Sequence, residues 1–124
     1  MKAILFKPAH LEEINEWNNS WKLSLVSLSD LPRVGYIVRG AAAGFLYQTD
    51  SNVCFLEGFI SNKYCEKGLR KEALDLISDE LVKAAVNFGF KKIVAKTRLK
   101  AIAERCENYA FQDKGIFAVY LKEV

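Results

Sequence analysis

A long amphipathic segment in the second half of the chain constrains the fold most strongly. Over residues 69–88 the apolar positions recur every three or four residues and charged residues occupy the opposite side, which predicts a long helix. Gly89 follows where a helix-ending glycine is expected. Runs with strand-like composition precede and follow this helix, at 53–60 and 92–96. A strand, a helix and a strand joined by short connections predict a parallel crossover unit.

The rest of the chain adds strands and helices around this unit. The expected additions are strands at 2–6, 34–38, 44–47 and 116–121, and helices at 11–21 and 101–109. The resulting order is β-α-β-β-β-α-β-α-β. It predicts an α/β fold with a mixed, mostly antiparallel sheet flanked by helices.

Composition places the chain among ordinary globular proteins. Its 124 residues are 51% hydrophobic and 27% charged, without a low-complexity tract, which predicts a single domain over residues 1–124. No apolar run approaches the ~20 residues that cross a bilayer, and the N-terminal sequence lacks a signal-peptide pattern, so we expect a cytoplasmic protein with no membrane partner. Three widely spaced cysteines and one histidine predict neither a disulfide framework nor a metal centre.

The net charge of +3 is mild but unevenly distributed. Between Asn62 and Lys100, basic residues outnumber acidic ones by ten to five, so the excess lies around the long helix and the strand after it. This placement favours an anionic ligand there. The lysines and arginine of 91–100 flank an apolar run, as the solvated ends of a strand do, and we therefore expect no nucleic-acid partner.

Three segments, in this order and at these separations, resemble the GNAT N-acetyltransferase superfamily. Residues 55–60 (FLEGFI) look like its central fourth strand, and 87–94 (NFGFKKIV) are similar to the end of its coenzyme-binding helix and the turn into strand five. Residues 103–111 (AERCENYAF) resemble its closing motif, usually written Y-E-K-x-G-F. In its short length the chain is similar to small phage-type members. The resemblance implies an acetyltransferase-like domain that uses acetyl-CoA as co-substrate.

The resemblance also implies two contact regions for coenzyme A. The pantetheine arm would lie along the fourth strand and pair with the backbone at Phe59 and Ile60, like an added strand. The pyrophosphate would lie at the start of the long helix, where unpaired amides and the helix dipole favour anions. The residues implied at that helix start are Lys67, Gly68, Leu69, Arg70 and Lys71.

The helix start departs from the family's pyrophosphate loop, usually written Q/R-x-x-G-x-G/A. Counting back from Gly89 places Arg70 first in this motif, with Ala73 and Asp75 at the two glycine positions. A second register keeps Gly68 in the loop and loses the leading arginine. The sequence leaves both registers open. It also leaves open that these basic residues only solvate a helix end.

Three residues are candidates for proton transfer. Glu57 lies in an apolar strand, where a charge needs a function or a partner. The resemblance implies a general base there, and a solvated or paired carboxylate is the equal alternative. Cys106 occupies a position where the family commonly has tyrosine and would protonate the leaving thiolate, although buried cysteines more often pack as small hydrophobes. Tyr109, one turn later, is a second candidate donor.

Two functions of different kinds fit these residues. The basic helix start and Glu57 favour an acetyl-CoA-dependent N-acetyltransferase that acts on an amine of a small molecule or a protein. The missing loop glycines and the missing motif tyrosine favour a catalytically inactive GNAT-fold protein that binds a partner. An exposed sheet edge after the last strand would also allow a homodimer.

Overall fold

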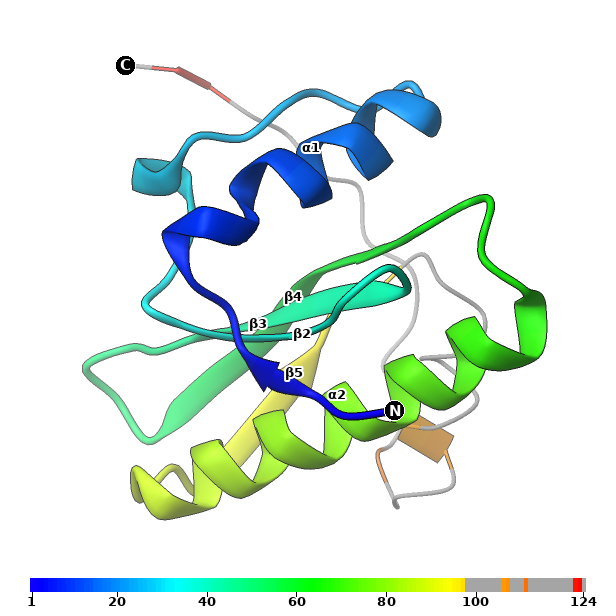
Figure 1. Ribbon diagram of the computed structural model, residues 1–124. Helices are drawn as coiled ribbons and strands as arrows, with labels where there is room; N and C mark the ends of the chain where they lie inside the picture. The colour runs from blue at the N-terminus through cyan, green and yellow to red at the C-terminus, as the bar shows by residue number, and fades with distance from the viewer. Residues whose placement is uncertain (98–105, 108–110, 112–121, 124) are drawn as a thin grey trace.

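The structure, a computed structural model, describes residues 1–97, 106–107, 111 and 122–123. One five-stranded sheet lies between two helices, with α1 on one face and α2 on the other (Figure 1). In chain order the elements are β1 (Ile4–Leu5), the 3₁₀ turn η1 (Pro8–His10), α1 (Leu11–Ser20), the 3₁₀ turn η2 (Leu28–Asp30), β2 (Val34–Val38), β3 (Ala42–Tyr47), β4 (Val53–Ser61), α2 (Lys67–Asn87) and β5 (Lys92–Ala95).

The sheet has the strand order β1-β2-β3-β4-β5, and only its last pair is parallel. The three pairs formed among β1 to β4 are antiparallel, and α2 carries the chain across one face so that β5 returns beside β4. The predicted mixed, mostly antiparallel sheet and its parallel crossover are therefore confirmed. The helix and strand predicted at 101–109 and 116–121 lie outside the described residues, apart from Cys106 and Glu107, which are helical.

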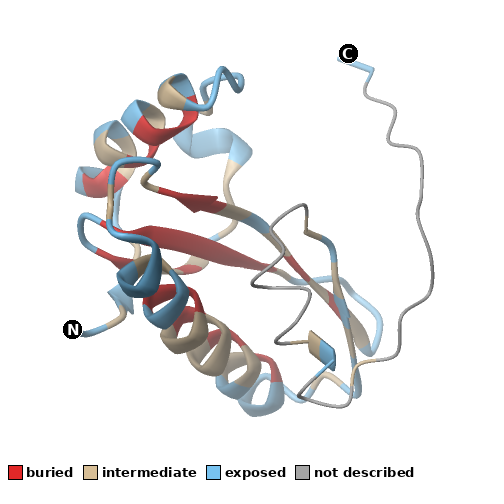
Figure 2. Cartoon of the chain, turned by 90° about the vertical axis from the view of Figure 1, so that its right-hand side faces the viewer, coloured by how far each residue is buried: buried red, intermediate tan, exposed pale blue. Residues whose placement is uncertain are grey.

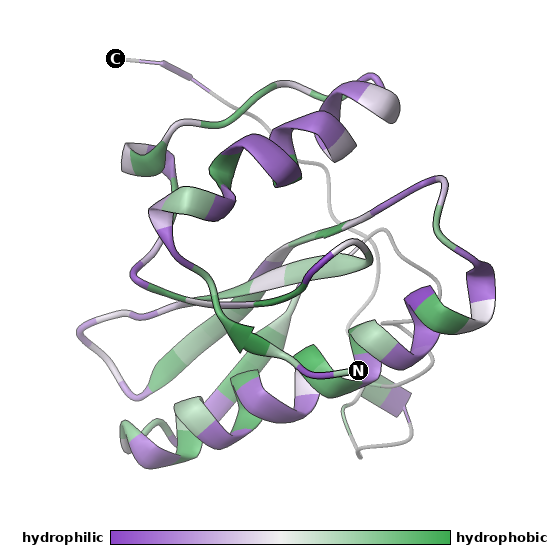
Figure 3. Cartoon of the chain, viewed as in Figure 1, coloured by the Kyte–Doolittle hydropathy of each residue, from purple (hydrophilic) through white to green (hydrophobic). Residues whose placement is uncertain are grey.

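Hydrophobic side chains fill both faces of the sheet, and the buried residues concentrate on the strands and on the helix sides that face them (Figure 2). On the α2 side, Leu56 packs in one cluster with Ile77 and Leu81. On the α1 side, Ile14 and Phe45 anchor a second cluster. The strands are predominantly hydrophobic, whereas α1 and α2 alternate hydrophobic and hydrophilic residues along their length (Figure 3). Among the described residues, no helix has the length and apolar character needed to cross a membrane.

The structure differs from the predicted elements mainly at their ends. The first strand is reduced to Ile4–Leu5 because Pro8 begins a 3₁₀ turn that leads directly into α1. Strand β3 begins two residues earlier than predicted, at Ala42. The first two residues are fully buried alanines: Ala42 packs in the cluster on the α2 side and Ala43 in the cluster on the α1 side. Leu69 and Phe88, expected on the buried face of the long helix, are 42% and 53% exposed because they lie at its two ends.

A carboxylate fixes the end of α1 nearest the β2–β3 hairpin. Glu13 accepts hydrogen bonds from the Arg39 side chain and from the Gly40 backbone amide, which lie in the turn between the two strands. The Glu13 side chain is 19% exposed and that of Arg39 is 62% exposed. This contact joins α1 to the middle of the sheet, so that the opposite end of the helix faces β4.

We expect Gly44→Ala to destabilise the protein. A Cβ at this position would lie 2.6 Å from two Phe59 ring atoms and 3.2 Å from the Ile77 methyl group. Because this region is closely packed, the added methyl should lower the free energy of unfolding by about 1–3 kcal/mol. Urea denaturation measures the change. Gly68→Ala is the matched control, since its Cβ would meet only the Glu66 carboxylate at 3.5 Å; equal losses in both variants would contradict the packing argument.

Candidate active site

Strand β4 contains an irregularity halfway along its length. Its pairing with β3 shifts register between Ala43, which faces Ile60, and Phe45, which faces Glu57, so β4 carries one residue more than β3. The backbone at Gly58, within this stretch, has a φ of 71°, which L-residues rarely adopt. Such bulges bend a strand and often lie beside active sites, where they redirect side chains. An isolated glycine inside a strand pattern is the sequence signal for this feature.

The edge of β4 that faces β5 is paired over only part of its length. The parallel register ends with Leu56 beside Ala95, and the Lys96 amide donates to the Leu56 carbonyl at 3.0 Å. Strand β4 continues to Ser61, beyond the end of β5. Phe59 and Ile60, predicted to pair with the pantetheine arm, therefore lie where no described strand accompanies β4 on this edge.

The unaccompanied stretch of β4 leads to the start of α2. The Arg70 amide donates to the Glu66 carbonyl at 2.9 Å, so the amides of the three preceding residues lie before the first helical hydrogen bond. The N-cap residue, Glu66, makes no side-chain capping hydrogen bond. Gly68 is the second residue of α2 and is exposed. The basic side chains around this end are those of Lys67, Arg70 and Lys71.

This placement distinguishes the two motif registers. Ala73 is fully buried and Asp75 lies in the third turn, so the register that begins at Arg70 would put both glycine positions inside the helix. Amides inside a helix are already hydrogen-bonded to carbonyls and cannot bind phosphate. The register that keeps Gly68 places a glycine beside the free amides, and the geometry favours it.

Glu57 lies on the opposite face of β4 from the α2-side core. Its side chain is 32% exposed, and its Oε1 lies 3.4 Å from the Lys96 Nζ. The same ammonium group lies 5.1 Å from the centre of the Phe55 ring. Glu57 therefore has a charged partner within the sheet, as one of the two sequence-based interpretations requires. Its role as a base stays a prediction.

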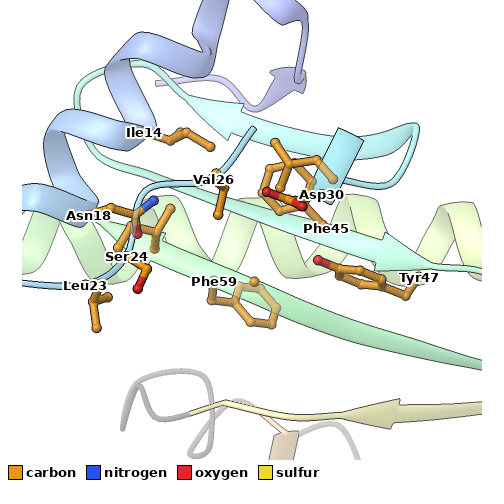
Figure 4. Close-up of a pocket in the computed structure, with 12 residues that line it drawn as sticks. Ile14, Asn18, Leu23, Ser24, Val26, Asp30, Phe45, Tyr47 and Phe59 are labelled. Atoms are coloured by element: carbon orange, nitrogen blue, oxygen red, sulfur yellow. The ribbon is translucent and has the colours of Figure 1, made fainter. Parts of the chain in front are cut away.

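A pocket of about 360 Å³ opens on this same face of the sheet, between β3, β4, α1 and the segment that follows α1 (Figure 4). Gly58, the residue at the bulge, forms part of its wall. The polar side chains that line the pocket are those of Asn18, Ser24, Asp30 and Tyr47. Its apolar walls include Ile14, Leu23, Val26, Phe45, Phe59 and Ile60.

Side-chain hydrogen bonds, rather than strand pairing, hold the segment that forms the outer wall of this pocket. The Asn15 side chain donates to the Val26 carbonyl at 2.8 Å and accepts from the Val26 amide at 2.9 Å. At the C-terminal end of β4, the Trp21 indole donates to the Ser61 carbonyl at 2.7 Å. These contacts attach the start of the segment to β4 and its middle to α1.

One charged group, the Asp30 carboxylate, makes one end of the pocket negative. The Asp30 carboxylate and the Tyr47 hydroxyl lie at this end, and Leu23, Asn18 and Ser24 lie at the other (Figure 4). Hydrogen bonds from the backbone and side chain of Ser27 lower the pKa of Asp30, which keeps it charged. Burial, followed by the charges of Glu57 and Asp30, raises the pKa of the Tyr47 phenol.

The remaining sequence candidates lie apart from this pocket or outside the described residues. Cys106 packs against the core cluster on the α2 side, the contact that a packing role requires, and its role as a proton donor stays a prediction. Tyr109 lies outside the described residues. The single histidine of the sequence, His10, lies just before α1 and is buried, and its Nδ1 accepts a hydrogen bond from the Lys7 amide at 3.0 Å.

Sequence reasoning missed Asp30 and Tyr47. Asp30 belongs to a polar, turn-rich stretch, and Tyr47 ends a strand, so neither stands out by composition. Only the Ser27-Leu28-Ser29-Asp30 spacing, which matches a helix-capping pattern, could have indicated an ordered turn there. That pattern explains why Asp30 is held in place and not why it faces a pocket.

Comparison with known proteins shows likeness in structure. Neither a protein-family model nor a curated protein matches the sequence. The TTHA1254 protein of Thermus thermophilus has a TM-score of 0.67 and 15% identity, with 100% of this chain and 98% of that one covered. An acetyltransferase of Trypanosoma brucei has a TM-score of 0.64 and 12% identity over 98% of this chain and 99% of that one.

The aminoglycoside N-acetyltransferase AAC(6')-Iy, solved in complex with CoA, has a TM-score of 0.61 and 15% identity. The similarity extends over 99% of this chain and 100% of that one. At identities this low, the comparisons establish the fold. The chain has the fold of the GNAT-type acetyltransferases, as the three sequence segments predict.

The electrostatics of the pocket predict a change in the titration of Tyr47. Removing the Glu57 charge should lower the Tyr47 pKa, because the phenolate would no longer be repelled by that carboxylate. NMR of ¹³C-labelled tyrosine, assigned with Tyr47→Phe, measures this pKa in Glu57→Gln. Asp30→Asn should produce a smaller decrease, and Glu80→Gln none, since Glu80 acts on Tyr36. An unchanged Tyr47 pKa in Glu57→Gln would place that carboxylate away from the pocket.

Proposed function

We propose that this protein binds acetyl-CoA and transfers its acetyl group to an amine. One observation carries the proposal: the unaccompanied stretch of β4, with Glu57 at its beginning, leads to a helix start that offers free backbone amides beside Lys67, Arg70 and Lys71. The acetyltransferase fold supports it. An AAC(6') enzyme of the same fold was solved with CoA, which supports a coenzyme-binding role for this fold.

The residues at the start of α2 fit a pyrophosphate. A glycine within a helix costs stability relative to alanine, and neither a positive φ nor close packing requires one at position 68. A ligand that approaches the backbone closely would require it. In this assignment Gly68 and Leu69 offer backbone amides, and Lys67, Arg70 and Lys71 supply positive charge.

The other binding region and the base lie on β4. Phe59 and Ile60 would hold the pantetheine arm through backbone hydrogen bonds, as in strand addition. When bound, acetyl-CoA supplies a thioester whose carbonyl carbon forms the new bond to nitrogen as the bond to sulfur breaks. Glu57 would accept the proton that the ammonium group of the acceptor must lose before it can attack. The thiolate then needs a proton, for which Cys106 and Tyr109 remain the proposed donors.

A catalytically inactive, partner-binding protein of the same fold is the second candidate. The ion pair between Glu57 and Lys96 favours it, because a base engaged by a lysine is less available to an incoming ammonium group. The absence of further glycines at the start of α2 favours it as well. Coenzyme binding without turnover would support this second function.

We expect Glu57→Gln to retain coenzyme affinity and to lose turnover by about 10²–10⁴-fold, because the amide cannot accept the proton. Calorimetry with coenzyme A measures the first quantity, and release of free thiol from acetyl-CoA measures the second. Glu12→Gln removes the same charge from the exposed first turn of α1 and should change neither. Full turnover by Glu57→Gln would remove this residue as the base.

Gly68→Ala tests the pyrophosphate assignment through two opposed readouts. Alanine should raise the free energy of unfolding by up to about 1 kcal/mol, because it favours the helix. The added methyl group should at the same time weaken coenzyme A binding, since it would stand between the phosphates and the amides. Urea denaturation and calorimetry on the same variant measure both effects. Higher stability with unchanged affinity would place the pyrophosphate elsewhere.

A further inference from the structure

The pocket between α1, the segment after it, and strands β3 and β4 has properties that specify its ligand further (Figure 4). We propose that it binds a small apolar primary monoamine in its ammonium form, with the charged group at the Asp30–Tyr47 end. Acetylation of this ligand rests on the proposed function. Its binding does not, because the protein can be titrated with amines in the absence of acetyl-CoA.

The size and walls of the pocket specify the body of the ligand. Its volume of about 360 Å³ lies at the lower end of the range typical of small-molecule sites, about 300–1,000 Å³. Phe45 contributes an aromatic wall, and Leu23 and Val26 contribute aliphatic ones. Burial of an apolar group against such walls supplies most of the binding free energy. The walls therefore fit a hydrocarbon or aromatic body.

The polar groups specify a single positive charge at one end. Asp30 is the charged residue among those that line the pocket. Its Oδ2 accepts both hydrogen bonds from Ser27, and among the described residues its Oδ1 has no donor. The Tyr47 hydroxyl, near this carboxylate and near Glu57, offers an acceptor oxygen to the same ammonium group. A charge-assisted hydrogen bond to Asp30 would fix the amine beside the proposed base.

The opposite end of the pocket argues against a ligand with several charges. Asn18 and Ser24 are its polar residues, and the Asn18 side chain donates to Asn15 at 3.2 Å. A second or third ammonium group would therefore lie against Leu23 without a carboxylate. Burial of an unpaired charge is costly, so polyamines and aminosugars should bind less well than an apolar monoamine.

The test is a titration of the ¹⁵N-labelled protein without acetyl-CoA, followed by NMR. The probes are phenethylamine, its neutral analogue phenethyl alcohol, and spermidine. We expect phenethylamine to shift the amide signals of the pocket residues, and the alcohol and spermidine to bind at least about tenfold more weakly. Asp30→Asn keeps an oxygen that can accept the Ser27 hydrogen bonds and should reduce phenethylamine affinity by about tenfold.

Two further variants separate charge from structure. Ser27→Ala removes the hydroxyl that contacts Asp30 but keeps the carboxylate, so phenethylamine affinity should change much less than in Asp30→Asn. Tyr47→Phe keeps the aromatic ring and removes the hydroxyl, and it should weaken phenethylamine binding more than phenethyl alcohol binding. The spectrum of each variant reports whether it is folded.

The outcomes distinguish this inference from the proposed function. Equal binding of amine and alcohol, preferred binding of spermidine, unchanged affinity in Asp30→Asn, or absence of phenethylamine binding would each overturn the inference. Binding of phenethylamine without its acetylation, followed by mass spectrometry with acetyl-CoA present, would support the pocket and contradict the transferase. Acetylation of another acceptor without phenethylamine binding would support the transferase and contradict the proposed ligand of the pocket.

Discussion

The bulged pairing of β3 with β4 is the constraint on which the candidate site depends. Halfway along β4, the extra residue reverses the alternation of its side chains between the α1 face and the α2 face. Glu57 precedes the bulge and faces the pocket side, whereas Phe59, which follows it, packs toward the core on the α2 side. The same strand thus contributes to the core, to the pocket wall and to the free edge at which we propose that the coenzyme binds. A regular strand would present only two alternating sets of side chains.

The charges of the site are divided between two regions of opposite sign. The entrance of α2 carries Lys67, Arg70 and Lys71, while the pocket end carries Asp30 with Glu57 nearby. Such a division suits a reaction between an anionic coenzyme and a cationic acceptor, because each binds where its own charge is favoured. The mild net charge of +3 does not reveal this division, because it is summed over the whole chain.

Local patterns in the sequence predict the elements of the fold well but predict the pocket poorly. The periodicity of 69–88 and the glycine after it depend on one helix alone, and the structure places α2 at Lys67–Asn87. The resemblance of 55–60 to a family strand identifies β4 and, with it, Glu57. Asp30 and Tyr47 meet only because the segment after α1 folds back over β3. That contact is a property of tertiary packing, and no spacing in the sequence encodes it.

The way in which the segment after α1 is attached has a consequence for how acceptor preference can evolve. Asn15 anchors the segment through its side-chain amide, and no strand ladder of the sheet includes the residues between α1 and β2. Insertions or substitutions there can therefore reshape one wall of the pocket while the core and the free edge of β4 stay intact. Under the proposed function, the acceptor site and the coenzyme site would be structurally separable, so that exchange of a single surface segment would change the acceptor alone.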